Sequence, residues 1–132
     1  MYLDRLNENE KKNFLNLAYY IANADEDFSI EEKNLINDYR KEMGLFDYEP
    51  KKIEFEEVID FFSNKEVEKK NIVFIEIFAL ILADANYEEK EKDLVNKMQK
   101  KFGFTNEKVD ELCQWVKNVI EIYARGEELV NQ

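Results

Sequence analysis

Apolar side chains recur every three or four positions along most of the chain, which is the spacing of helices that bury one face. The first such stretch follows Asn7, whose side chain can form a capping box with Glu10, and continues to about Asp25. Ser29 begins a second stretch, which Gly44 is expected to end in the left-handed conformation. The pattern therefore predicts two consecutive helices joined by a short turn.

The middle of the chain continues this helical pattern. Pro50 suits the first turn of a third helix, because its ring fixes a helical φ and its missing N–H is not needed there. Ser63 and Glu66 offer another capping box, before a helix that runs to about Asp84. We therefore expect two further helices between residues 50 and 84.

Two helices are expected in the last third of the chain. One covers about Glu88 to Phe102 and ends at Gly103, and the other follows Thr105 and reaches Gly126. No segment alternates convincingly with the period of two that marks strands. The predicted fold class is therefore all-α, a bundle of six or seven helices.

An internal repeat organises these helices. Residues 24–45 align without a gap with residues 83–104, at a constant offset of 59 positions and with eight identities. The pattern predicts two related helix-turn-helix halves, about 14–45 and 73–104, packed with pseudo-twofold symmetry in a single domain, 1–132. The identities are Ala24 with Ala83, Asp25 with Asp84, Glu32 with Glu91, Lys33 with Lys92, Leu35 with Leu94, Asn37 with Asn96, Lys41 with Lys100, and Gly44 with Gly103.

Charge and composition narrow the possible partners. The formal charge of −11 has the wrong sign for a protein that neutralises nucleic-acid phosphates or binds anionic membrane surfaces. The apolar run 72–82 is too short to span a bilayer, which takes about 20 residues. Cys113 is the only cysteine and is expected to pack against apolar neighbours, and the N-terminus lacks the apolar stretch of a signal peptide. We expect a cytoplasmic protein with a protein partner and no nucleic acid.

The chain contains no histidine. This absence excludes Ser-His-Asp and Cys-His catalysis, and also zinc sites with histidine ligands. Paired carboxylates can hydrolyse glycosides, but they need an open sugar-binding cleft, which the seam of a compact helical domain does not suggest. The sequence therefore predicts a binding or sensing module and not an enzyme.

Four acidic residues fall on the apolar faces of the predicted helices. Asp25 and Asp84 continue the apolar stripes of the helices that they end, and Glu32 and Glu91 lie in phase with apolar residues of the helices that follow. An ionised carboxylate out of water costs several kcal/mol unless it is hydrogen-bonded, paired with a cation or bound to a metal. The four acids therefore need partners.

Two interpretations of these acids are open. In the first they only cap the turns and helix starts, or a lysine from elsewhere neutralises them. In the second a divalent cation is held by Asp25, Asp27 and Glu32, by Asp84 and Glu91, or by both sets together. All-oxygen ligands favour calcium, magnesium or manganese over zinc.

Four aromatic residues lie in or beside the less regular segment that connects the two halves: Phe46, Tyr48, Phe61 and Phe62. Aromatic side chains that are incompletely covered can anchor a protein partner. Packing into the core is the other interpretation of the same residues.

At the acidic turns the sequence resembles the TerB-like tellurite-resistance domain. Copies of that domain carry an apolar helix ending in Ala-Asp-Gly, then a hydrophobic residue, a helix-starting Ser or Thr, and a glutamate seven positions after the aspartate. The matching segments here are 24–32 and 83–91, and with their flanking helices the resemblance covers about residues 10–104. The glycine of the motif is replaced by Glu26 in one half and by Ala85 in the other, so the turn is expected to differ from that of the family.

The resemblance implies an all-helical, pseudo-symmetric bacterial domain linked to tellurite and other chemical stress. It also implies metal binding by the acids, here Asp25, Glu32, Asp84 and Glu91, and association with partner proteins. The sequence therefore predicts a TerB-like binding and sensing module of a bacterial stress response that binds a divalent metal. The alternative is a protein-interaction adaptor whose inward acids are only structural caps.

Overall fold

The computed structural model describes residues 1–24, 30–83 and 89–132. These residues form six α-helices and one short 3-10 helix, and none of them forms a strand. The predicted all-α bundle is therefore confirmed. The elements are η1 (Leu3–Arg5), α1 (Glu8–Ala24), α2 (Ile30–Met43), α3 (Phe55–Ser63), α4 (Val67–Ala83), α5 (Glu89–Phe102) and α6 (Asn106–Val130).

Local capping explains where two of these helices begin. The Asn7 side chain accepts from the Glu10 N–H at 2.8 Å, and the Glu10 carboxylate accepts from the Asn7 N–H at 2.8 Å. This is the reciprocal capping box that the sequence predicts at the start of α1. At the start of α6, the Thr105 hydroxyl accepts from the Lys108 N–H at 3.1 Å, as expected from the sequence.

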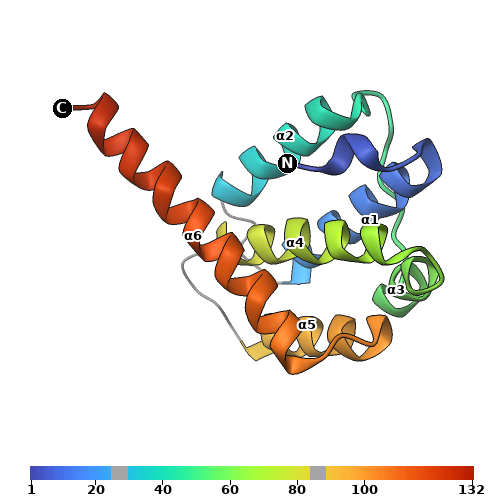
Figure 1. Ribbon diagram of the computed structural model, residues 1–132. Helices are drawn as coiled ribbons and strands as arrows, with labels where there is room; N and C mark the ends of the chain where they lie inside the picture. Colours follow the sequence, from blue (N-terminus) through green and yellow to red (C-terminus); the bar gives the residue numbers. More distant parts are fainter. Residues whose placement is uncertain (25–29, 84–88) are drawn as a thin grey trace.

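The helices pack around α1 and α4, which contact each other at the centre of the bundle (Figure 1). Helix α2 packs against α1 and α4, and α3 packs against α1, α4 and α5. Helix α6 crosses α4 and then continues away from the other helices, as the red end of the chain in Figure 1 shows. A single apolar core of side chains from every helix lies between these layers.

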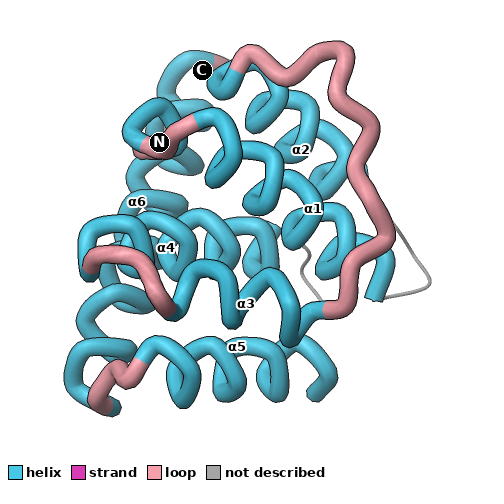
Figure 2. The backbone as a smooth tube through the Cα atoms, turned by 90° about the vertical axis from the view of Figure 1, so that its right-hand side faces the viewer, coloured by secondary structure: helices cyan, strands magenta, loops and turns pink. Residues whose placement is uncertain are grey.

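The segment between α2 and α3 differs from the prediction. Pro50 does not begin a helix: residues 45–54 run along the side of the bundle, and α3 begins only at Phe55 (Figure 2). Side chains from α1 and α2 hold this backbone instead. The Asn16 side chain accepts from the Lys51 N–H at 2.8 Å, and the Arg40 guanidinium donates to the carbonyls of Leu45 and Tyr48. These hydrogen bonds, local from Arg40 and long-range at Asn16, fix the segment in an extended path, against the local preference of proline for a first helical turn.

Two other predicted boundaries are wrong. Ser63 is the last residue of α3 and donates to the Asp60 carbonyl at 2.8 Å, so it does not cap α4, which begins at Val67. Helix α6 does not stop at Gly126 but continues to Val130. The N–H of a mid-helix glycine still bonds within the helix, and only a left-handed φ makes glycine a stop signal.

The first two helices of each half recur at the repeat offset. Helices α1 and α4 both have 17 residues and α2 and α5 both have 14, and every start and end is displaced by 59 positions. Both predicted stop glycines have positive φ, 69° for Gly44 and 71° for Gly103. Each is followed by a residue whose N–H donates to the carbonyl five positions back. Outside residues 25–29 and 84–88, the described helices of the two halves therefore have matching bounds and matching glycine ends.

Candidate functional site

Most of the predicted acidic site lies outside the residues that the structure describes. This holds for Asp25, Asp27 and Asp84, and also for the side chain of Glu91. Glu32 is described: it lies in the first turn of α2 with 1% of its surface exposed. The predicted inward direction of Glu32 is confirmed, and its side chain has an interaction partner within the chain.

The described part of the chain does not itself contain a metal centre. Within residues 1–24, 30–83 and 92–132, no three cysteine or acidic side chains are grouped so that they could hold a metal ion. A divalent cation usually takes six or more oxygen ligands, so Glu32 could contribute only together with the acids of the turn before it. The other ligands of the predicted calcium, magnesium or manganese site would have to come from residues 25–29 and 84–88 and from Glu91.

The four predicted partner-binding aromatics have different environments. Phe46 is 65% exposed, whereas Tyr48 and Phe61 are partly buried against the core. Phe62 is fully buried, because α3 places it on the same face as Phe55. Phe62 therefore cannot be a surface anchor as predicted. Phe46 is the one of the four whose side chain is mostly exposed to solvent.

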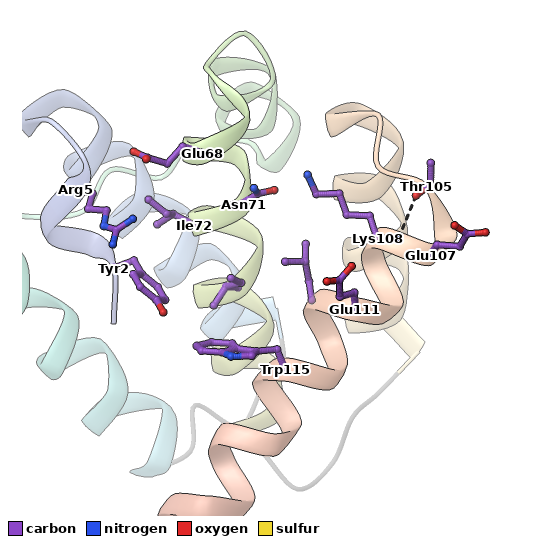
Figure 3. A pocket seen from close by; sticks show the side chains of 12 residues that line it. Tyr2, Arg5, Glu68, Asn71, Ile72, Thr105, Glu107, Lys108, Glu111 and Trp115 are labelled. Atoms are coloured by element: carbon purple, nitrogen blue, oxygen red, sulfur yellow. Dashed lines mark hydrogen bonds between the residues drawn. The ribbon is translucent and has the colours of Figure 1, made fainter.

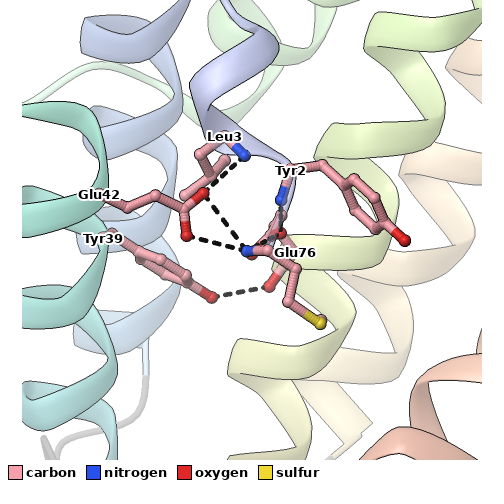
Figure 4. Close-up of polar contacts among 6 residues, drawn as sticks. Tyr2, Leu3, Tyr39, Glu42 and Glu76 are labelled. Carbon is pink, nitrogen blue, oxygen red and sulfur yellow. Dashed lines mark hydrogen bonds and ion pairs between the residues drawn. The ribbon is translucent and has the colours of Figure 1, made fainter.

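A polar cluster around Glu76 joins the N-terminal segment to α2 and α4 (Figure 4). The Glu76 carboxylate, 2% exposed, accepts from the Met1 ammonium at 2.7 Å and from the Tyr2 N–H at 3.0 Å. The Glu42 carboxylate accepts from the same ammonium at 3.0 Å and from the Leu3 N–H at 2.7 Å. Glu76 is the single acid within the apolar run 72–82, which is a sequence signal of a buried polar contact, but no local pattern identifies Met1 as its partner.

The protonation of this cluster follows from burial and from the two carboxylates. Burial lowers the pKa of the Met1 ammonium, but the hydrogen bonds and charges of Glu76 and Glu42 outweigh this and raise the pKa above its usual value. Burial, with the nearby carboxylate charges, also raises the pKa of Tyr39, whose hydroxyl donates to the Glu76 carbonyl at 2.9 Å. Both groups therefore stay protonated at neutral pH, and the cluster holds η1 against α2 and α4.

A second buried acid, Glu10, is also neutralised by the protein. Besides its role in the capping box, its carboxylate lies 3.2 Å from the Lys69 ammonium and 3.9 Å from the Lys65 ammonium. The buried acids Glu10 and Glu76 therefore have structural partners, in line with the rule that buried charges are paired.

A groove of about 790 Å³ lies between η1, α4 and α6 (Figure 3). Tyr2 and Trp115 form one wall, with ring centroids 6.1 Å apart, and the Arg5 guanidinium lies 5.1 Å from the centre of the Tyr2 ring. Lys108 and the buried, unpartnered Oδ1 atom of Asn71 line the other side. The groove mixes aromatic, cationic and acidic groups and has no single charge preference.

A second groove, of about 570 Å³, lies between α2, α4 and α6. Its α6 wall is formed by Val119, Ile120 and Tyr123, and Leu35 of α2 and Leu82 of α4 contribute apolar surface to it. The thiol of the single cysteine lies elsewhere on α6. Burial raises the pKa of Cys113 to about 11, so this thiol stays protonated near neutral pH, and it packs against the apolar core, as the sequence predicts.

No protein family, curated protein or solved structure matches this chain. No helix within the described residues is long and apolar enough to cross a membrane.

Proposed function

We propose that the chain is a helical binding and sensing module of the TerB type, which binds a divalent cation through the acids at its two turns. The burial of Glu32 in the first turn of α2 carries this proposal, because one of the predicted ligands is a carboxylate held out of water close in sequence to the acidic turn. The repeat supports a second set, since Glu91 occupies the same place in α5, 59 residues later. Calcium, magnesium and manganese are the candidate cations, by the oxygen chemistry of the ligands.

The wider role rests on the family resemblance and on the composition. The module acts without catalysis, in the cytoplasm of a bacterium, in a stress response of the tellurite-resistance type. Its two halves are related by pseudo-twofold symmetry, which the shared helix bounds at an offset of 59 support. Its partner is a protein, since a charge of −11 opposes binding to nucleic acid.

Thermal melts of the parent and of the double variant Asp25→Asn, Asp84→Asn test the metal site. The variant keeps the shape of the side chains but removes ligand charge. Calcium, magnesium or manganese should raise the stability of the parent by about 2.7 kcal/mol when the metal is at 100 times its Kd, and should hardly affect the variant. If the melting temperature of the parent is the same with each of the three cations at millimolar concentration as with a chelator, the proposal is wrong.

The second candidate function is a protein-interaction adaptor whose inward acids are purely structural. The full pairing of Glu10 and Glu76 by the chain itself favours it, because these buried acids need no metal. Asparagine caps a helix nearly as well as aspartate, so parent and double variant should then melt alike with or without cation. A double variant that is more stable than the parent near neutral pH would instead indicate unliganded acids that repel one another.

A further inference from the structure

A third groove, of about 680 Å³, lies between α1 and the segment 50–54 that leads to α3. Helix α1 forms one wall, and the segment forms the other. Figure 2 shows this segment beside α1, on the side of the bundle. The volume lies within the range of small-molecule binding sites, about 300–1,000 Å³. We therefore ask which ligand the groups on the two walls would bind.

Asn16 of α1 is a buried polar group in this groove. Its side chain is 4% exposed, and its Oδ1 atom accepts from the Lys51 N–H at 2.8 Å and from the Tyr48 hydroxyl at 2.9 Å. A backbone N–H can only donate, so the bond from Lys51 fixes which end of the Asn16 amide is the oxygen. The side chain of Asn16 is therefore held in one orientation by the groove itself.

The Nδ2 atom of Asn16 is left without an acceptor. It donates to no residue that the structure describes, and it is not sealed off from solvent. Because Asn16 lines the groove, this donor opens into it. A largely buried amide donor that is fixed in place favours a ligand that brings an oxygen acceptor.

Two lysines add positive charge to the same groove. Lys51 and Lys52 are exposed, and neither forms an ion pair within the described part of the chain. Glu54 is the only acid among the described lining residues, so the lining attracts anions although the whole chain has a formal charge of −11. The rest of the chain repels an anion in proportion to its charge, which favours a monovalent anion over a multivalent one.

The groove also offers an apolar surface. The Tyr20 ring lies with its centroid 5.7 Å from that of the buried Phe55 ring, and Tyr20 is still 37% exposed. Pro50 and Ile53 are half-buried and line the opposite wall. A flat apolar body can pack between these walls, because aromatic rings stack well on tyrosine.

We propose that this groove binds a small aromatic carboxylate, a ligand with one negative charge and a flat ring. The carboxylate oxygens accept from Asn16 Nδ2 and from the ammonium groups of Lys51 and Lys52. The ring packs against Tyr20 and Ile53. None of these residues is a proposed cation ligand, so the inference goes beyond the proposed function and does not rest on it.

Benzoate tests this site, titrated into isotope-labelled, metal-free protein and followed by NMR. The side-chain amide signals of Asn16 and the backbone signals of 51–53 should shift and saturate. Benzyl alcohol has the ring without the charge, and acetate has the charge without the ring. Each should bind at least about tenfold more weakly than benzoate, because each lacks one of the two contacts.

Three results of this titration would overturn the proposal. One is the absence of saturable shifts up to tens of millimolar benzoate. Another is benzyl alcohol binding as tightly as benzoate, which would show an apolar site without anion selectivity. The third is a set of shifts centred on Trp115, in the groove of Figure 3.

The variant Asn16→Asp tests the buried donor. Aspartate keeps an oxygen for the Lys51 N–H and the Tyr48 hydroxyl, but replaces the NH₂ group by a second oxygen. Benzoate binding should weaken by about tenfold or more, because the ligand loses a donor and meets a like charge. An Asn16→Asp protein that folds and binds benzoate like the parent would contradict the proposal.

A second variant tests the two lysines and does not depend on how well Asn16→Asp folds. Lys51→Gln together with Lys52→Gln should weaken benzoate binding by about fivefold, because both side chains are exposed. The matched control is Lys41→Gln together with Lys117→Gln, which removes the same charge from exposed positions outside the groove. The control should bind like the parent. Equal losses in the two double variants would show only an effect of net charge and would overturn the site.

Discussion

The two halves of the chain build their first two helices alike and their third helix differently. Helices α1 and α2 have the same lengths and the same offset as α4 and α5. Helix α3 has 9 residues and packs against three other helices, whereas α6 has 25 residues and continues beyond the bundle. The helices that share a pattern thus build the core, and the difference between the halves is concentrated in the exposed end of α6.

One core position also separates the halves. Leu17 of α1 and Glu76 of α4 occupy equivalent places in the repeat, and both are buried. The leucine packs among apolar side chains, whereas the glutamate meets the Met1 ammonium and the Tyr2 N–H. The same helical phase therefore supports an apolar contact in one half and an anchor for the N-terminal segment in the other.

The largest expected effect tests whether the two halves share one core. Ile21→Ala and Leu80→Ala alter equivalent buried positions of α1 and α4, and each should lower the free energy of unfolding by about 2–5 kcal/mol. Because α1 and α4 pack against each other, both variants should unfold in a single transition by calorimetry. Exposed Ile30→Ala is the control and should change little. Two separate transitions would show that the halves are independent units.

The next effect tests the difference at Glu76. Glu76→Ala removes the acceptor of a partly buried ammonium and of a backbone N–H, and should cost about 3 kcal/mol in urea unfolding. Glu42→Ala should cost about 1 kcal/mol, because the Glu42 side chain is partly exposed and water can replace it. Equal losses for the two variants would contradict the central role of Glu76 in the cluster.

The two glycines that end α2 and α5 give a smaller test of whether these helix ends are equivalent. Gly44→Ala and Gly103→Ala place a side chain in the left-handed region, where L residues are strained by about 1–2 kcal/mol. A new Cβ atom would meet no neighbour within 4 Å at either position, so strain alone should act. The two losses in unfolding free energy should therefore agree within about 0.5 kcal/mol. A clear difference would show that the two helix ends are not equivalent.

Much of the fold could be predicted from local patterns. The capping box of Asn7 and Glu10, the stop at Gly44 and Gly103, and the inward phase of Glu32 depend on residues close in sequence, and all are confirmed. The start of α3 could not be predicted in this way. The segment before it is held partly by a long-range contact, in which the Asn16 side chain of α1 accepts from the Lys51 N–H, and this bond forms only when α1 packs beside the segment.

The candidate site was less accessible to prediction for a related reason. The partners of Glu76 lie at the far end of the chain, so an acid in an apolar run signals a buried partner without identifying it. Phe61 and Phe62 are adjacent, and only the packing of α3 decides that Phe62 is buried while Phe61 remains partly exposed. The predicted acid pairs and the TerB-like function stay predictions.

The smallest expected effect is a pH dependence of the cluster that Glu76 of α4 forms with the Met1 ammonium and Glu42 of α2. The Met1 ammonium has a raised pKa in the folded chain, so it stabilises the fold fully below its unfolded pKa, near 8, and this contribution is lost as pH rises through the folded value. The free energy of unfolding should therefore decline modestly between pH 7 and about 9.5, where Tyr39 does not yet contribute, because the unfolded tyrosine titrates near 10. The double variant Glu76→Gln, Glu42→Gln keeps the shape of both side chains but removes the charges that raise the ammonium pKa. Its urea unfolding should lose this decline, whereas Leu17→Ala, at the equivalent position of α1, should keep it. An unchanged decline in the double variant would assign the pH dependence to groups outside the cluster.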